Sequence, residues 1–411
     1  MMMERREHFL QNIWLWSLLF FLLAALTGFL YRWGLISGEL FDLRLSNVRH
    51  AHSHLMFFNW VTPVPMAFIA YRILKTSPEA LRSFKWVIGT IIVTGFLSYP
   101  FFLMYGYHPV EIGTASLPFS VMLSGLVMIG WYWFAGIYLK FRKQAGSSLS
   151  LLFYDGALVM LVVSSLGAWG VAVTQFGNID NNLISGALTH FFLTTFTEGW
   201  CVLAAMGIIY EFISDEIEIP FDQNWLIAPI VLGAPLMFPF GLSADLLNDS
   251  LLMTAKIGSA LVGIGLASNI YFMFMATFIR TKPVWMIVLS LFALKVLVQL
   301  SSVLLPAVFW LGQHGLRVLY LHLLLLGFVS TLFFVAIHTV SQKISRAGLY
   351  LFIGTVLILL TTLVLISGFW PTGWQPQNVH FWVTVGALLP SVAITVELGI
   401  VCVWKYKRTI E

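Results

Sequence analysis

Long apolar runs divide this chain, and they limit what it can fold into more than any other feature. Twelve runs follow one another, each close to the roughly 20 residues that a helix needs to cross a bilayer. Helices rather than strands are expected, because backbone in contact with lipid must satisfy its own hydrogen bonds. The sequence therefore predicts an all-α polytopic membrane protein, with one membrane domain over 1–411. The predicted spans are 11–33, 51–74, 84–105, 116–140, 149–174, 183–212, 224–241, 251–279, 283–307, 315–341, 346–369 and 380–404.

The distribution of charge predicts the orientation in the membrane. Only 10% of the residues are charged, against about 25% in typical soluble domains. With the N-terminus in the cytoplasm, sixteen lysines and arginines fall in segments on the inner side and four on the outer side. Cytoplasmic loops carry such an excess of basic residues. We therefore expect a multi-pass protein of a bacterial-type inner membrane with both termini in the cytoplasm. Because the basic residues are scattered over short loops, no nucleic-acid surface is expected.

Two matching phrases indicate an internal repeat. HLMFFNWV begins at His54 and HLLLLGFV at His322, and each has a histidine, four apolar residues, a small or polar residue, an aromatic residue and a valine. His190 opens a looser third copy, HFFLTTFTEGW. The intervals are 136 and 132 residues, each close to a third of the chain. The pattern predicts pseudo-repeats in which the second, sixth and tenth spans are equivalent. Their approximate ranges are 11–140, 149–279 and 283–404.

Histidines gather where the second span begins. The stretch RHAHSHLMFFNW, residues 49–60, places His50, His52 and His54 on alternate positions. A neutral imidazole can bind a metal without bringing a charge into lipid, and ionisable groups in spans are usually functional. A histidine at a helix entrance is more often an interfacial hydrogen-bonding residue, and this alternative stays open. His50 and His54 share a helix face, where a copper ion could bind.

The three histidines that open the repeated phrase are the main metal-ligand candidates, because the repeat places them at an equivalent depth. His54, His190 and His322 open the three copies of the phrase, so the repeat would bring them to the same outer level of the membrane. The two cysteines both lie in apolar runs and are too few for a thiolate metal centre. Any metal must therefore rely on histidine, carboxylate or methionine.

These phrases resemble subunit I of the haem-copper oxidase superfamily, which includes nitric oxide reductases and has the NnrS proteins as twelve-span relatives. YLHLLLLGFVSTLFFVAIHT looks like the family's tenth helix, and HSHLMFFNWVTPVP looks like its second. The resemblance implies three four-helix arcs and a low-spin haem, b-type, near the outer face. His322 takes one axial position and His54 the other, with His52 as its rival. Arg49 and Arg317 lie just outside these histidines and could pair with the haem propionates, or could be ordinary interfacial residues.

The chain departs from the family where oxygen would be reduced. Tyr320 stands two residues before His322, where the family has the histidine that holds the catalytic high-spin haem. His190 is not followed by Pro-Glu-Val-Tyr, and the run 224–241 contains no histidine pair for copper. The resemblance thus implies a fold and one haem site, in a protein closer in character to the NnrS type than to an oxygen reductase. A copper ion would need an unusual site.

Two charged residues lie inside predicted spans. Glu198 is two turns beyond His190, and a carboxylate at that depth should be neutral or partnered. It is either a proton-transfer or metal-adjacent acid, or a structural group bonded to the neighbouring threonines or to Trp200. Lys295, in the ninth span, is expected to pair with a carboxylate or a backbone carbonyl rather than to take part in chemistry.

Three classes of function remain open from the sequence. The first is a haem-binding membrane redox protein, an oxidoreductase if it is an enzyme, concerned with nitric oxide or electron transfer. Its partners would be an electron donor or a small gas ligand. The second is a metal-ion or proton transporter that uses the outer histidines and Glu198. The third is a haem-free assembly or structural protein. A Soret absorption band would separate the first class from the others.

Overall fold

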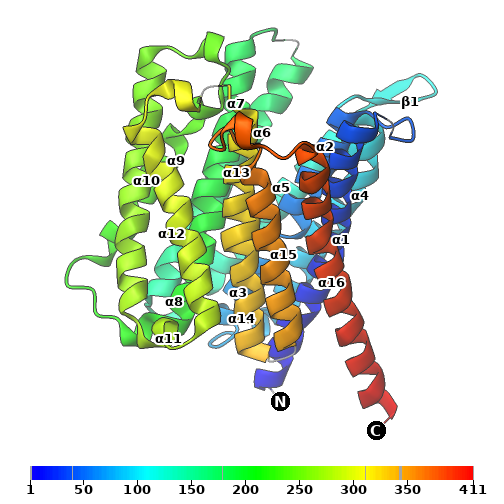
Figure 1. Ribbon diagram of the computed structural model, residues 1–411. Helices are drawn as coiled ribbons and strands as arrows, with labels where there is room; N and C mark the ends of the chain where they lie inside the picture. Colours follow the sequence, from blue (N-terminus) through cyan, green and yellow to red (C-terminus); the bar gives the residue numbers. More distant parts are fainter. Residues whose placement is uncertain (1, 39, 178, 311, 342–344, 411) are drawn as a thin grey trace. The chain divides into compact units, whose positions relative to one another are not determined.

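Helices make up almost all of the protein (Figure 1). The computed structural model describes residues 2–38, 40–177, 179–310, 312–341 and 345–410. Within these residues, ten helical stretches are long and apolar enough to cross a membrane. The prediction of an all-α polytopic membrane protein is therefore confirmed. The chain divides into two compact units, unit 1 (Met1–Gly146 with Phe333–Glu411) and unit 2 (Ser147–Leu332).

Unit 1 is built from the helices at the two ends of the chain. α1 packs against α2, α3 and α16, and α4 packs against α2 and α5. Aromatic rings fill its interior: Trp60 is fully buried and stacks on Phe21, with ring centroids 4.3 Å apart, and Phe334 stacks on Phe352 at 3.9 Å. The helices are α1 (Met2–Ser37), α2 (Leu45–Asn59), α3 (Pro63–Ile73), η1 (Pro78–Ala80), α4 (Leu81–Tyr105), α5 (Phe119–Arg142), η2 (Lys143–Ala145), α14 (Thr331–Ser341, which enters the unit at Phe333), α15 (Arg346–Val364), η10 (Thr372–Trp374) and α16 (Val379–Ile410). A small antiparallel hairpin pairs β1 (Val110–Ile112) with β2 (Ala115–Leu117).

Unit 2 contains the middle of the chain. α6 packs along α7 and α8, and α10 packs against both α9 and α12. Its interior is equally apolar, and Phe292 stacks on Phe328 with centroids 4.2 Å apart. The helices are α6 (Leu149–Phe176), α7 (Asn182–Thr194), η3 (Thr195–Cys201), α8 (Val202–Ile213), η4 (Ser214–Glu216), η5 (Gln223–Leu226), α9 (Ala228–Leu236), η6 (Phe238–Gly241), η7 (Ala244–Leu246), α10 (Asp249–Met275), α11 (Thr277–Arg280), α12 (Pro283–Leu304), η8 (Ala307–Phe309), α13 (His314–His322) and η9 (Leu323–Ser330).

The second predicted span, 51–74, is two helices rather than one. α2 ends at Asn59 and α3 begins at Pro63, so the chain between them leaves α-helical geometry. The Val61 N–H donates to the Met56 carbonyl at 3.0 Å, a step of five residues that widens the turn. Pro63 suits the first position of a new helix because its missing N–H would have no partner there.

The seventh predicted span, 224–241, is also interrupted, because prolines recur through it. It consists of η5, α9 and η6, with Pro229 at the start of α9 and Pro235 within it. The buried Asn269 amide donates to the Leu226 carbonyl at 2.9 Å, and the Tyr210 hydroxyl donates to Asn269 Oδ1 at 2.7 Å. These side chains satisfy polar backbone at the interruption, as the interior of a membrane protein requires.

All three spans that carry the repeated phrase become irregular just after its histidine. The second span breaks after Asn59, and the sixth and tenth widen into the π-helical segments η3 and η9. π-helical turns occur mostly as local bulges and are frequent at functional sites. The common position of the irregularity agrees with the repeated phrase, whereas the three pseudo-repeats and the three arcs stay predictions.

Candidate functional site

A cluster of buried polar side chains lies inside unit 2. Glu198, from η3, and Lys295, from α12, are 1% and 0% exposed. Lys295 Nζ donates to Glu198 Oε2 at 2.5 Å and also to Gln299 Oε1. The Tyr320 hydroxyl donates to Glu198 Oε1 at 2.5 Å. Both carboxylate oxygens therefore accept hydrogen bonds, and the expectation that Lys295 pairs with a carboxylate is confirmed.

Local helix geometry brings these groups together. Lys295 and Gln299 are four residues apart on α12, so they project from the same face. Gln299 Nε2 lies 3.5 Å from the Met237 sulfur and from the Ser259 carbonyl, which orients the amide. The threonines beside Glu198 do not bind it: Thr197 donates instead to the Leu193 carbonyl of its own helix at 2.8 Å.

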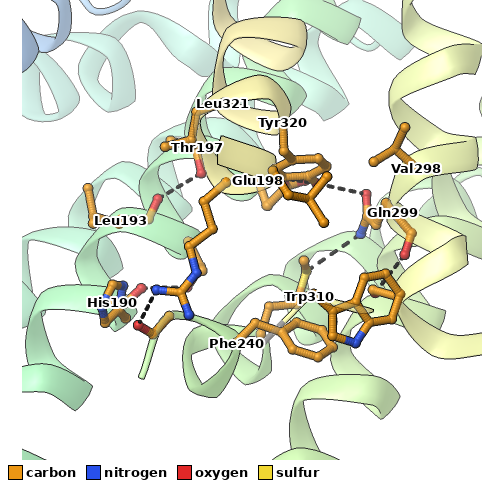
Figure 2. A pocket seen from close by; sticks show the side chains of 16 residues that line it. His190, Leu193, Thr197, Glu198, Phe240, Val298, Gln299, Trp310, Tyr320 and Leu321 are labelled. Atoms are coloured by element: carbon orange, nitrogen blue, oxygen red, sulfur yellow. Dashed lines mark hydrogen bonds between the residues drawn. The ribbon is translucent and has the colours of Figure 1, made fainter. Parts of the chain in front are cut away.

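A cavity of 210 Å³ lies beside this cluster. Figure 2 shows His190 on one side of it, Gln299 and Trp310 on the opposite side, and Glu198 and Tyr320 between them. The volume exceeds the roughly 150 Å³ that holds one benzene ring and is below the roughly 300 Å³ at which pockets for drug-sized ligands begin. The cavity therefore suits a small molecule with a mainly apolar surface.

His190 and Arg317 line the same cavity. Arg317 donates to the Gly241 and Leu242 carbonyls at 3.2 and 3.3 Å, which ties α13 to the end of η6. The His190 ring packs directly on Gly241, where a Cβ atom would overlap the imidazole. The sequence-predicted residues His190, Glu198, Arg317 and Tyr320 therefore surround one cavity within unit 2.

His52, in unit 1, is held against α1 by a hydrogen bond and by close packing of its ring. Its Nδ1 lies 2.8 Å from the Ala24 carbonyl oxygen, and its ring packs against Gly28, one turn further along α1. A Cβ atom at Gly28 would come within 2.9 Å of the ring. A carbonyl can only accept, so Nδ1 must carry the proton, and Nε2 then holds the lone pair of the neutral ring.

His54 has a different environment, also within unit 1. Its Nε2 hydrogen-bonds with the Tyr107 hydroxyl at 2.8 Å, and its ring stacks on Phe102 with centroids 3.8 Å apart. Its Nδ1 is buried without a partner among the described residues. His50 packs edge-on against Tyr107 at 4.8 Å. Burial raises the pKa of Tyr107 to about 12, so this phenol stays neutral at ordinary pH.

The remaining predicted residues lie in different parts of the fold. Arg49 is exposed at the start of α2. His322 belongs to unit 2, where its Nδ1 donates to the Val318 carbonyl at 2.7 Å. His54 and His322 thus belong to separate units, and their facing one another across a haem stays a prediction. No group of three or more metal-binding side chains occurs in the described part of the chain, so copper also stays a prediction.

Sequence reasoning missed Gln299, Tyr107 and Gly28. The sequence could have indicated Gln299, because it lies one helical turn after the lysine predicted to be inside a span. Nothing in the sequence indicated Tyr107, since it is 53 residues from His54 and meets it only through the packing of α2 against α4. Gly28 likewise becomes meaningful only when α1 lies against α2.

Comparison with known proteins places the fold. No protein-family model and no curated protein matches the sequence. Among solved structures, the chain is similar to a haem-copper terminal oxidase, determined by cryo-EM as a dimer, with a TM-score of 0.63 and 13% sequence identity. The similarity covers 99% of this chain and 83% of the oxidase chain. The protein is therefore an all-α polytopic membrane protein with a fold like that of this haem-copper oxidase.

Proposed function

We propose that this protein is a haem-binding membrane redox protein, closer in character to the NnrS proteins than to an oxygen reductase. The fold supports this proposal. The main observation behind it is that His52 hydrogen-bonds to the Ala24 carbonyl and packs its ring against Gly28. Histidines that bind metals usually donate their other ring N–H to a carbonyl or carboxylate, which sets the tautomer and the ring orientation. His52 has this arrangement.

We assign His52, rather than His54, as the residue of unit 1 that would hold haem. His54 Nε2 is engaged by Tyr107, whereas the Nδ1 bond of His52 leaves Nε2 as its ligand atom. Within unit 2, His322 makes the same Nδ1-to-carbonyl bond, so it too would suit the haem-binding role predicted from the sequence. A haem held by these histidines would supply one-electron chemistry, and the hydrogen bonds of the histidines would tune it.

The cavity in unit 2 is proposed as the place where a small gas ligand binds. Its mainly apolar wall suits a neutral gas molecule, and Tyr320, whose hydroxyl donates to Glu198, lines it. Lys295 compensates the charge of Glu198, so this pair can hold a proton beside the cavity without leaving a bare charge in the membrane.

The test is the absorption spectrum of purified protein prepared with haem. We expect a Soret band and sharp reduced bands, both strongly weakened in His52→Ala and His322→Ala and retained in His54→Ala. Gly28→Ala should also weaken haem retention, because its methyl group displaces the His52 ring. Gly354→Ala is the matched control, since a Cβ atom at this helical glycine meets open space. Haem retention by His52→Ala together with its loss in His54→Ala would reverse the assignment, and absence of haem from the wild type would reject the function.

A second candidate function is proton or metal-ion transport. A buried ion pair beside a cavity favours it, because such groups in membrane proteins often lie on proton or ion pathways. Protein in liposomes that contain a pH indicator would carry protons at a rate that falls in Glu198→Gln. An unchanged rate in this variant would exclude Glu198 as a carrier.

A further inference from the structure

A long groove runs between α1 and α4 in unit 1. It has a volume of 690 Å³, within the roughly 300–1,000 Å³ typical of sites for organic ligands. α1 lines it from Phe9 to Phe20 and α4 from Lys85 to Leu97. Apart from its polar residues at one end, the walls are apolar and aromatic.

The length of the groove matches one leaflet of a bilayer. At 1.5 Å per residue, the two lined stretches are roughly 17 and 18 Å long, slightly more than half of a hydrocarbon core that is roughly 30 Å thick. The Phe20 and Phe96 rings meet at the apolar end, with centroids 4.8 Å apart. A ligand in this groove would therefore be long, apolar and confined to one leaflet.

The other end of the groove is polar and cationic. Asn12 and Lys85 are exposed there, and neither side chain makes a hydrogen bond or ion pair with any residue that the structure describes. Arg82 is exposed one turn earlier on α4, and Trp86, 62% exposed, follows Lys85. Tryptophan is enriched at the membrane–water interface, and basic pockets between spans bind anionic lipid head groups.

Gly89 forms part of the groove one turn beyond Lys85. A Cβ atom at this position would meet nothing within 4 Å, so the space beside the helix backbone is open. A single acyl chain can lie there with its head group beside Lys85 and Asn12. We propose that the groove between α1 and α4 binds one phospholipid with an anionic head group.

The proposal can be tested by native mass spectrometry of the purified full-length protein with added lipid. Phosphatidylglycerol and phosphatidylcholine with identical acyl chains are the two probes. We expect the wild type to retain one tightly bound phosphatidylglycerol and to retain phosphatidylcholine more weakly. Lys85→Met should weaken retention of phosphatidylglycerol about fivefold, the effect of one basic residue near an anionic membrane surface. Gly89→Leu should abolish it by filling the groove.

Two control variants separate this site from general effects on the membrane surface. Gly136→Leu places the same side chain at an exposed glycine of α5 that also has open space. Lys140→Met removes an exposed lysine from the same helix. Both should retain the lipid as the wild type does. Equal retention of the two lipids by the wild type, or undiminished retention in Gly89→Leu, would overturn the proposal. Neither result depends on haem, so the proposed redox function is tested separately.

Discussion

Lys295 and Glu198 are buried together, so removing one leaves the charge of the other in an apolar interior. We predict that Lys295→Met lowers the free energy of unfolding by about 3–5 kcal/mol, the usual effect of breaking a buried pair. The double variant Glu198→Leu with Lys295→Met should recover most of this loss, because an apolar pair removes both charges. Denaturant unfolding in detergent measures both values.

Lys256→Met is the control for this experiment. Lys256 is a half-buried lysine of α10 with no ion pair among the described residues, so its replacement should change the free energy of unfolding little. An equal loss of stability in Lys256→Met and Lys295→Met would show that the ion pair itself has no special role.

Tyr107 provides a pH-dependent prediction, because burial raises its pKa to about 12. The fold favours the neutral phenol, whose hydroxyl lies 2.8 Å from His54 Nε2. Its contribution to stability should be fully present below about pH 10, the ordinary tyrosine pKa. It should be lost as the pH rises through about 12.

Replacing Tyr107 tests the same bond at neutral pH. Tyr107→Phe should destabilise the protein by about 1–3 kcal/mol, since it leaves a buried imidazole nitrogen without a partner. It should also remove a late step from the ultraviolet titration of tyrosinate. Tyr105→Phe, at a neighbouring tyrosine that is 40% exposed, should not change stability measurably. A stability of Tyr107→Phe equal to the wild type would contradict the importance of this bond.

At the scale of elements, close backbone contact holds the interrupted seventh span in place. A Cβ atom at Gly233 of α9 would lie 2.6 Å from the Gly258 carbonyl oxygen of α10, and one at Gly258 would lie 2.7 Å from the Gly233 carbonyl oxygen. Small residues at such contacts allow membrane helices to approach each other closely. Because each obstacle is backbone, neither helix can relieve a clash by moving a side chain.

We predict that Gly258→Ala lowers the free energy of unfolding by about 1–3 kcal/mol, as overpacking typically does. Gly354→Ala should be neutral or slightly stabilising, because alanine is the better helix former and its methyl group meets open space. Thermal unfolding of the two variants in detergent makes the comparison. A Gly258→Ala variant as stable as Gly354→Ala would show that α9 and α10 separate freely.

At the scale of the whole molecule, the described residues contain ten helical stretches long enough to cross a membrane, and twelve crossings stay a prediction that also counts the two interrupted spans. The excess of basic residues on one side then predicts cytoplasmic termini. Reporter fusions at Gly146, after α5, should report the cytoplasm, and fusions at Gly113, in the β1–β2 turn, should report the outer side. The reverse pattern would contradict the predicted orientation.

The sequence by itself determined the class of fold. Apolar runs of membrane-spanning length allow few structures other than helices, because lipid offers the backbone no hydrogen-bond partners. It also indicated the pairing of Lys295, since an uncompensated charge at that depth is too costly to persist. The interruptions at 60–62 and in 224–241 were not predicted, although prolines mark both. An apolar run indicates the length of a membrane span, but it does not show whether the helix within that span is continuous.

Only the tertiary structure decided how the candidate side chains are used. The sequence ranks His54 above His52, since the repeated phrase begins at His54. A repeated phrase does not show which imidazole nitrogen makes a hydrogen bond in the folded protein. Packing of α2 against α1 and α4 gives His52 the Ala24 carbonyl and gives His54 the Tyr107 hydroxyl. Likewise, Glu198 and Lys295 are 97 residues apart and meet only after η3 and α12 pack together. Contacts of this kind depend on the relative placement of helices, which the local pattern of apolar residues does not specify.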